Sequence, residues 1–161
     1  MEFPVPGSPT GFFPLNSIGP VDFEGRTLWL SYHLPVGTGD RIRILFEKFT
    51  RRPRQGVVLT MGNRRHEIAI NGQQSAQFIL WADTAPAEVE VDITKAGRAG
   101  SLVIYNIWQD EKYGTILHGL NWTAMAVRHG PDGSLLLDCS DGYGLEPSFG
   151  DLVLRLFHEP A

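Results

Sequence analysis

Segment 108–122, WQDEKYGTILHGLNW, concentrates side chains that are suited to holding a ligand. It brings two tryptophans together with amides, carboxylates, a tyrosine and a histidine, in what should be a loop or an irregular pair of strands. Aromatic rings offer flat apolar faces to a sugar ring, and binding residues tend to lie on loops that a rigid scaffold positions. We therefore expect a ligand site formed by Asn106, Trp108, Asp110, Tyr113, His118, Asn121 and Trp122. The alternative is that the tryptophans are buried for packing in the core.

A second stretch whose residue types could bind a ligand is LDCSDGYGLEPSFGDLVL, residues 137–154, in which acidic residues alternate with glycines. A calcium loop of the EF-hand type needs oxygen ligands at every second position and a glycine at the sixth. The acidic residues here do not keep that spacing; they are Asp138, Asp141, Glu146 and Asp151. We therefore interpret residues 141–150 as a connection between two strands, with calcium binding by these carboxylates as the less favoured alternative. No other cofactor is expected.

Signatures of catalysis are mostly missing from the chain. It contains no G-x-S-x-G elbow, no H-E-x-x-H pair, no phosphate-binding glycine loop and no C-x-x-C ligand pair. Cys139 lies in an alternating apolar stretch and should be a buried structural thiol. The five histidines are too far apart in sequence for two of them to share one strand; they are His33, His66, His118, His129 and His158. We therefore expect no catalytic residues, and a hydrolase or isomerase with a site assembled from distant His and Asp residues is only a third hypothesis.

The composition is typical of a soluble globular domain. Hydrophobic residues make up 42% of the chain and charged residues 20%, so the chain is apolar enough to form a core. The net charge of −4 argues against a general attraction to nucleic acid or to an anionic membrane. The chain shows no signal-peptide pattern and no apolar run near the ~20 residues that span a bilayer. We therefore expect a cytoplasmic protein whose partner is a carbohydrate or another small polar ligand.

An alternation of apolar and polar residues with period two dominates the chain from residue 27 onward. It is clearest in TLWLSYHL (27–34), RIRILFEK (41–48) and AEVEVDI (87–93). About ten such runs occur at the spacing of roughly 8–12 residues that sandwiches and barrels show, and no useful segment carries an apolar stripe of helical period. We predict an all-β fold, namely an antiparallel β-sandwich of the jelly-roll or galactose-binding-like type, with a closed β-barrel as the alternative.

The first twenty residues differ from the rest of the chain because they contain five prolines. Proline cannot sustain a helix and removes backbone donors from a strand. We predict an extended proline-rich arm over residues 1–20 and a single β-sandwich domain over residues 21–161. Phe3, Phe12, Phe13 and Leu15 give the arm apolar side chains that pack either on its own domain, which is the simpler interpretation, or on a neighbouring subunit.

The stretch VEVDITKAGRAGSLVIYNIW, residues 89–108, resembles the strand pairs of galactose-binding and carbohydrate-binding-module sandwiches. In this pattern an alternating acidic strand is followed by a loop of small residues and a long apolar strand. The resemblance is one of fold, which does not by itself assign a function. The leading hypothesis is a non-catalytic binding module for carbohydrate, similar to a lectin. The alternative is a structural or interaction protein that assembles as a homo-oligomer through its N-terminal arm and its exposed sheet edges.

Overall fold

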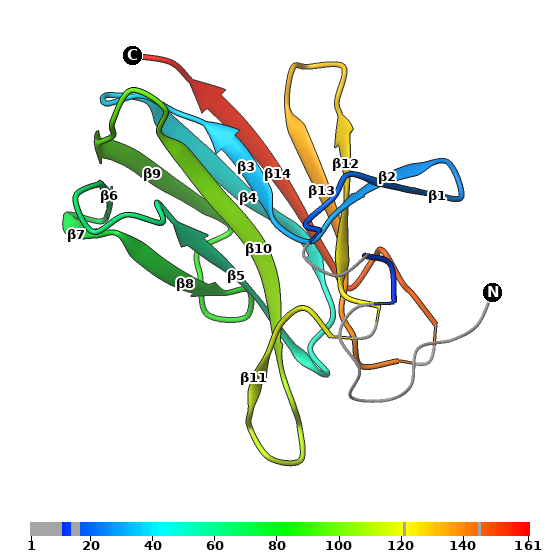
Figure 1. The fold of residues 1–161 in the computed structure, drawn as a ribbon. Helices are drawn as coiled ribbons and strands as arrows, with labels where there is room; N and C mark the ends of the chain where they lie inside the picture. Colours follow the sequence, from blue (N-terminus) through cyan, green and yellow to red (C-terminus); the bar gives the residue numbers. More distant parts are fainter. Residues whose placement is uncertain (1–10, 14–16, 121, 145) are drawn as a thin grey trace.

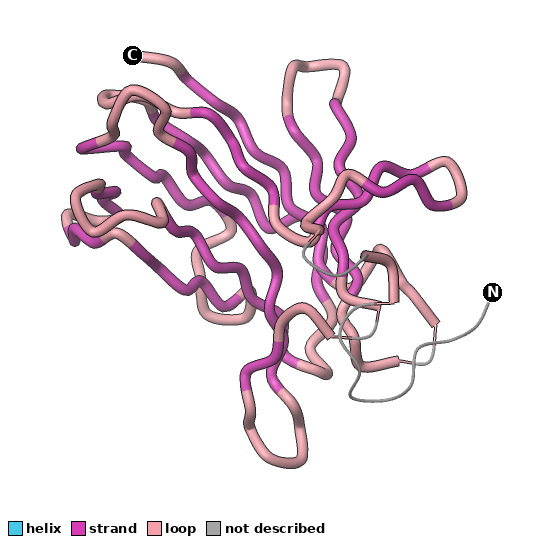
Figure 2. Tube along the Cα trace, viewed as in Figure 1, coloured by secondary structure: helices cyan, strands magenta, loops and turns pink. Residues whose placement is uncertain are grey.

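The chain folds into two antiparallel β-sheets that pack face to face (Figure 1). The computed structural model describes residues 11–13, 17–120, 122–144 and 146–161. None of the described residues is helical, and Figure 2 shows the strands joined by loops alone. The sheets do not close into a barrel, so the prediction of an antiparallel β-sandwich is confirmed and the closed barrel is not adopted. Within the described ranges there is accordingly no helix that could cross a membrane.

The larger sheet has nine strands and the smaller sheet has five within the described residues. In spatial order, the larger sheet contains β1 (Val21–Phe23), β2 (Arg26–Trp29), β12 (Ala124–His129), β13 (Leu135–Ser140), β14 (Leu152–Glu159), β4 (Arg41–Phe49), β9 (Glu88–Lys95), β6 (Glu67–Ile70) and β7 (Gln73–Ser75). The smaller sheet contains β11 (Ile116–Leu117), β10 (Ser101–Gln109), β5 (Arg54–Thr60) and β8 (Gln77–Trp81), and β3 (Tyr32–Pro35) also pairs with β10. The smaller sheet therefore ends at β8 on one side.

Strand β4 illustrates how the alternation builds the core. Ile42 and Ile44 are fully buried between the sheets, whereas the side chains of Arg41 and Arg43 point outward. The same rule applies to the neighbouring strands, so the inner faces of both sheets are mostly apolar and form the main core cluster. On the outer face of the larger sheet, arginines pair with carboxylates of adjacent strands, as Arg43 does with Glu88 at 3.1 Å. That face is a solvated surface with balanced charges.

A smaller apolar cluster covers β2 and β12 on the side away from the main core. Its buried members are Phe13, Leu28, Ala124 and Ala126, and Phe12 packs against them. Phe12 and Phe13 therefore pack on their own domain, as the simpler interpretation of the arm expects. Phe3 and Leu15 lie outside the described residues, as do the other residues of 1–10 and 14–16.

Two runs of sequence cross from one sheet to the other. The run TLWLSYHL divides at Leu30 and Ser31, so that β2 pairs with β12 in the larger sheet while β3 pairs with β10 in the smaller sheet. In the same way, β7 and β8 are separated by Ala76 alone but belong to different sheets. Residues 82–87 then return the chain to the larger sheet as β9. One crossing therefore joins the sheets at β2 and β3, and the other joins them at β7 and β8.

Candidate functional site

The predicted ligand residues on β10 lie inside the sandwich. Asn106 and Trp108 share the inner face of β10 and are 0% and 4% exposed. The side-chain amide of Asn106 donates to the carbonyl oxygen of Ser140 at 3.0 Å, and the Trp108 ring meets the Tyr143 ring edge-on, with centroids 5.7 Å apart. Because both side chains are enclosed, neither offers a face on which a sugar ring could stack. The sequence indicated this burial, because the alternation along the strand places Asn106 and Trp108 on the same face as Leu102, which is buried.

Trp122 and His118 are also engaged in packing. Trp122 is 2% exposed and lies against Phe12, with ring centroids 4.7 Å apart. The His118 ring lies over Tyr105, with centroids 4.2 Å apart, and its Nδ1 is 3.1 Å from the carbonyl oxygen of Asn106. Desolvation by burial lowers the pKa of His118. Its neutral form is therefore favoured, as expected of a histidine that packs against an aromatic ring.

Asp110 and Tyr113 lie apart from these residues, in the hairpin that joins β10 to β11. The Asp110 carboxylate accepts a hydrogen bond from the N–H of Tyr113 at 2.7 Å, and Tyr113 is 75% exposed. Beside the hairpin is an open groove of about 570 Å³, lined by Arg51, Arg52, Arg54, Gln109, Asp110, Glu111 and Gly114. The structure thus divides the predicted site into a packed group and this exposed hairpin. Asn121 lies outside the described residues, and a sugar site at the hairpin stays a prediction.

The four carboxylates considered for calcium do not form one cluster. Asp138 lies on the outer face of β13 and pairs with Arg128 at 2.6 Å, while Glu146 is exposed. Asp141 and Asp151 are close together, because the N–H of Asp141 donates to Oδ2 of Asp151 at 3.0 Å. Over the described part of the chain, no group of three or more His, Cys, Asp or Glu side chains is arranged to hold a metal ion.

Asp141 and Asp151 belong instead to a buried polar contact at one end of the sandwich. Gln55, on the inner face of β5, donates its side-chain amide to Oδ2 of Asp141 at 2.7 Å. The N–H of Tyr143 donates to Oδ1 of Asp141 at 3.1 Å. Burial raises the pKa of both carboxyls, that of Asp151 to about 6. Because N–H donors face these carboxyls, the arrangement anchors residues 141–151 to the sandwich.

His158 and Asp40 bring an imidazole and a carboxylate within hydrogen-bond reach, with Nε2 2.7 Å from Oδ2. The same carboxylate accepts hydrogen bonds from the N–H groups of Gly37 and Ala161, and the Gly37 N–H and the His158 ring hold the pKa of Asp40 below its usual range. These bonds tie the end of the chain to the turn before β4.

Cys139 is fully buried as predicted, and burial raises the pKa of its thiol well above its usual value. The Cys139 thiol is therefore held in its protonated form, which is a poor nucleophile.

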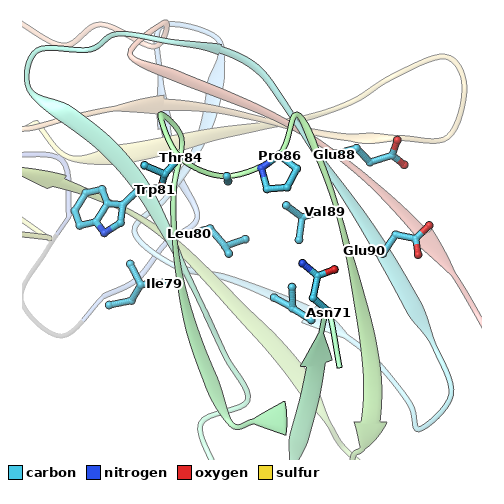
Figure 3. A pocket seen from close by; sticks show the side chains of 11 residues that line it. Asn71, Ile79, Leu80, Trp81, Thr84, Pro86, Glu88, Val89 and Glu90 are labelled. Carbon is cyan, nitrogen blue, oxygen red and sulfur yellow. The ribbon is translucent and has the colours of Figure 1, made fainter. Parts of the chain in front are cut away.

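A cleft of about 450 Å³ opens between β8 and the beginning of β9. Leu80 from β8 and Val89 from β9 point into it, and Pro86 lies in the turn that closes one end (Figure 3). Asn71 contributes an amide at the opposite end. Ile79 lines the same cleft but points to the other side of β8, onto the outer face of the smaller sheet. The cleft therefore combines an apolar floor with a few polar groups, which is the usual character of a binding site.

The wall of this cleft is an unpaired edge of β8. In an antiparallel sheet, successive residues direct their backbone N–H and C=O groups alternately to the two sides of the strand. The N–H of Ala82 donates to the C=O of Gln55 on β5, so the even-numbered residues face β5 and the odd-numbered residues face away from it. The N–H and C=O of Ile79, the C=O of Gln77 and the N–H of Trp81 are consequently unpaired in the part of the chain that the structure describes.

Strand β8 differs from the other edge strands of the two sheets. β1 and β7 are three residues long, β11 has two residues, and β3 ends in a proline. Short strands and proline make an edge a poor template for another strand. β8 has five residues, QFILW, with neither charge nor proline, and Ile79 is 44% exposed. Among the described edge strands, β8 is therefore the least protected.

Sequence reasoning did not find this site. The run QFILW was visible as part of an uncharged strand, SAQFILWA. Whether a strand lies at an edge depends on the order in which strands pair, and that order is not contained in the alternation of one strand.

Comparison with known proteins assigns no family to the chain. No family model, no curated protein and no solved structure matches it. The function is therefore argued from the residues and the geometry described above.

Proposed function

We propose that this protein is a non-catalytic binding module that takes an extended polypeptide segment along the free edge of β8. One observation carries the proposal: β8 is an unprotected edge strand that borders a cleft with an apolar floor. Addition of a strand to an exposed sheet edge is a recurrent mode of peptide recognition. In this mode, main-chain hydrogen bonds supply affinity and pockets for alternate side chains supply specificity.

The free backbone groups of β8 define what the incoming segment must offer. Ile79 presents both its N–H and its C=O, so it pairs fully with one residue of the segment. The segment residue that lies opposite Trp81 must accept a hydrogen bond from the Trp81 N–H. The segment residue that lies opposite Gln77 must donate one to the Gln77 C=O. The other outward groups already have partners, because the Gln77 N–H donates to Oγ of Ser75 and the Trp81 C=O accepts from the N–H of Ala85. A segment of about five residues is therefore sufficient.

The surroundings of the edge favour an uncharged segment. The side chains that form the floor of the cleft are apolar, and they include Ile70, Leu80 and Val89. Glu88 and Glu90 border the cleft, but they point away from it and pair with arginines of β4 (Figure 3). A charged side chain that entered the cleft would lose its water without gaining a partner. We therefore expect apolar side chains at alternate positions of the ligand.

Peptide binding tests the proposal. A panel of uncharged peptides of about five to nine residues, with apolar side chains at alternate positions, is titrated against the full chain by calorimetry. At least one peptide is expected to bind and to slow hydrogen exchange of the Ile79 amide, because this N–H then gains an acceptor. The proposal is contradicted if no peptide binds, or if binding leaves exchange at Ile79 unchanged.

Two variants of Ile79 separate edge binding from other effects. Ile79→Pro removes the outward N–H without removing a hydrogen bond to β5, so the fold should be kept and peptide affinity should fall at least about tenfold. Ile79→Lys places a charge beside the edge and should have a similar effect. Ile116→Lys is the matched control, because Ile116 is an equally exposed isoleucine on β11, away from the cleft. An equal loss in the Ile79→Lys and Ile116→Lys variants would rule out the edge as the site.

A carbohydrate ligand is the second candidate, favoured by the hairpin between β10 and β11. There the exposed ring of Tyr113 stands near a groove lined by guanidinium groups, an amide and carboxylates. Such a ring supports the apolar face of a sugar, and the polar side chains can bond its hydroxyl groups.

Glycan-array binding distinguishes the two candidates. If a sugar binds at the hairpin, Tyr113→Ala and Asp110→Ala should abolish binding, while Ile79→Pro should leave it unchanged. If the folded protein binds no glycan across a broad array, the carbohydrate proposal is contradicted and the peptide proposal is unaffected.

A further inference from the structure

Three buried side chains at one end of the sandwich each carry a polar atom that has no hydrogen-bond partner within the described residues. The atoms are Oε1 of Gln55, Oδ1 of Asn106 and Nε1 of Trp108. None of the three residues is more than 4% exposed. Buried polar atoms in native proteins nearly always have a partner, and an ordered water supplies it where the polypeptide does not.

Strands β5 and β10 bring the three side chains together. Trp108 lies directly opposite Gln55 in the antiparallel pair, and Asn106 lies two residues before Trp108 on the same strand. Residues that lie opposite one another, or two apart on one strand, share a face of the sheet. The three side chains are therefore neighbours on the inner face of the smaller sheet, in agreement with their burial.

Hydrogen bonds fix which way the Gln55 amide is turned. Its nitrogen lies among three oxygen atoms, at 2.7 Å from Oδ2 of Asp141, 3.1 Å from the carbonyl oxygen of Pro53 and 3.2 Å from Oγ1 of Thr50. If the amide were turned over, Oε1 would face the carbonyl oxygen of Pro53, which has no proton to donate. The atom of Gln55 that needs a partner is therefore an acceptor.

The Asn106 amide is fixed in the same way. Its nitrogen donates to the carbonyl oxygen of Ser140 at 3.0 Å, so the opposite orientation would set two acceptor oxygens against each other. The atom of Asn106 that needs a partner is therefore also an acceptor. The indole N–H of Trp108 can only donate.

The free atoms gather where the connection of residues 141–151 leaves β13. The amides of Gln55 and Asn106 both reach this place, because they bond the adjacent residues Asp141 and Ser140. The Trp108 ring reaches it as well, through its contact with the Tyr143 ring. Two acceptors and one donor thus face one enclosed region between the sheets.

The number of donors and acceptors matches one water molecule. Two amide oxygens require two O–H donors, and the indole N–H requires an acceptor. A water molecule offers two donors together with acceptor lone pairs, and a buried water typically makes about three hydrogen bonds. The hydroxyl group of an alcohol or a sugar has only one donor. An ammonium group or a metal cation has no acceptor for the indole N–H.

We infer that Gln55, Asn106 and Trp108 form a binding site for one internal water molecule. The water donates to the two amide oxygens and accepts from the indole N–H. By bonding both amides at once, it holds them in the orientation in which they reach across to Ser140 and Asp141 of the larger sheet. The inference is independent of the proposed function, since none of the three residues lines the cleft beside β8.

A crystal structure that resolves ordered water tests the site directly. One fully occupied water is expected at about 2.7–3.2 Å from Oε1 of Gln55, Oδ1 of Asn106 and Nε1 of Trp108. The inference is overturned if the three atoms bond other groups of the protein there, or if no water lies among them.

Nuclear magnetic resonance tests the same site in solution. The indole N–H of Trp108 should show a cross-peak to water with the sign of a long-lived contact, because an enclosed water leaves slowly. The partly exposed Trp81 is the internal control and should show only the short-lived contacts of surface water. A Trp108 indole without a cross-peak, or with one of the same sign as Trp81, would contradict a bound water.

A substitution of Asn106 shows whether the amide oxygens hold the water. Asn106→Leu removes one acceptor and fills the site with apolar atoms, so the number of long-lived waters counted by oxygen-17 relaxation should fall by one. Gln74→Leu, at an exposed position of β7, is the control and should keep the wild-type number. An unchanged number in the folded Asn106→Leu variant would overturn the inference. The two measurements on the wild-type chain decide the question even where this variant does not fold.

Discussion

Gln55 and Asp141 join the two sheets through a hydrogen bond in the interior, with Nε2 of Gln55 2.7 Å from Oδ2 of Asp141. Gln55 belongs to β5 of the smaller sheet, and Asp141 directly follows β13 of the larger sheet. Both side chains are buried. A buried carboxyl needs such a donor, because its charged form is otherwise strongly disfavoured away from water.

Replacing Gln55 with leucine should destabilise the protein. The variant leaves the Asp141 carboxyl without its side-chain donor, which should cost about 2–3 kcal/mol in the free energy of unfolding. Urea unfolding followed by circular dichroism measures this quantity. Gln74→Leu, at an exposed position of β7, is the control and should change stability by less than about 0.5 kcal/mol. Equal effects of the two substitutions would show that the contact contributes nothing to stability.

Stability should depend on pH through Asp151. Burial raises its pKa to about 6 in the folded protein, whereas an unfolded chain has a value near ~4. Between these values the folded state holds a proton that the unfolded state has lost. The contribution to stability is therefore complete below pH ~4 and is lost as the pH rises through about 6. Solvent screens this half-buried group, so the expected change is about 1 kcal/mol.

Asp151→Asn isolates this contribution. The difference in urea midpoint between wild type and variant should change between pH 4 and pH 6 and be constant from pH 7 upward. Taking the difference removes the pH dependence of other groups, such as Asp40, whose lowered pKa acts in the opposite direction. A difference that does not vary with pH would mean that Asp151 titrates normally.

Gly56 should not tolerate a side chain, because it lies under the ring of Trp81. A Cβ added at Gly56 would lie 2.8 Å from Cε3 of Trp81 and 3.1 Å from the C=O of Leu80. Gly56→Ala should therefore cost about 1–3 kcal/mol in stability and alter tryptophan fluorescence as the ring moves. Gly144→Ala is the control, since its nearest neighbour is at an ordinary 3.5 Å. Equal stability of the two variants would contradict the packing.

Calcium should leave the thermal stability unchanged. Asp138 is held by Arg128, and the carboxyls of Asp141 and Asp151 accept hydrogen bonds from nearby donors. Addition of calcium or of a chelator is therefore expected to shift Tm by less than about 1 °C. A rise of several degrees with calcium, absent with magnesium, would restore the calcium interpretation of residues 137–154.

The sequence alone determined that the protein is all-β and which residues alternate along each strand. In RIRILFEK, for example, Ile42 and Ile44 face the core and Arg41 and Arg43 face solvent, as the alternation predicts. This succeeds because the side-chain period of a strand is a local property, set by the backbone of a few consecutive residues. The same local rule placed Cys139 in the core.

Only the tertiary structure decided which strands lie at an edge and which polar residues are enclosed. The run TLWLSYHL contributes to two sheets, β8 is left unpaired on one side, and Trp108 and Trp122 are buried. Each of these facts depends on pairing and packing between residues that are distant in the chain, as are Gln55 and Asp141, 86 positions apart. No pattern within a single strand contains that information, because the pairing order is selected by the packing of the whole core.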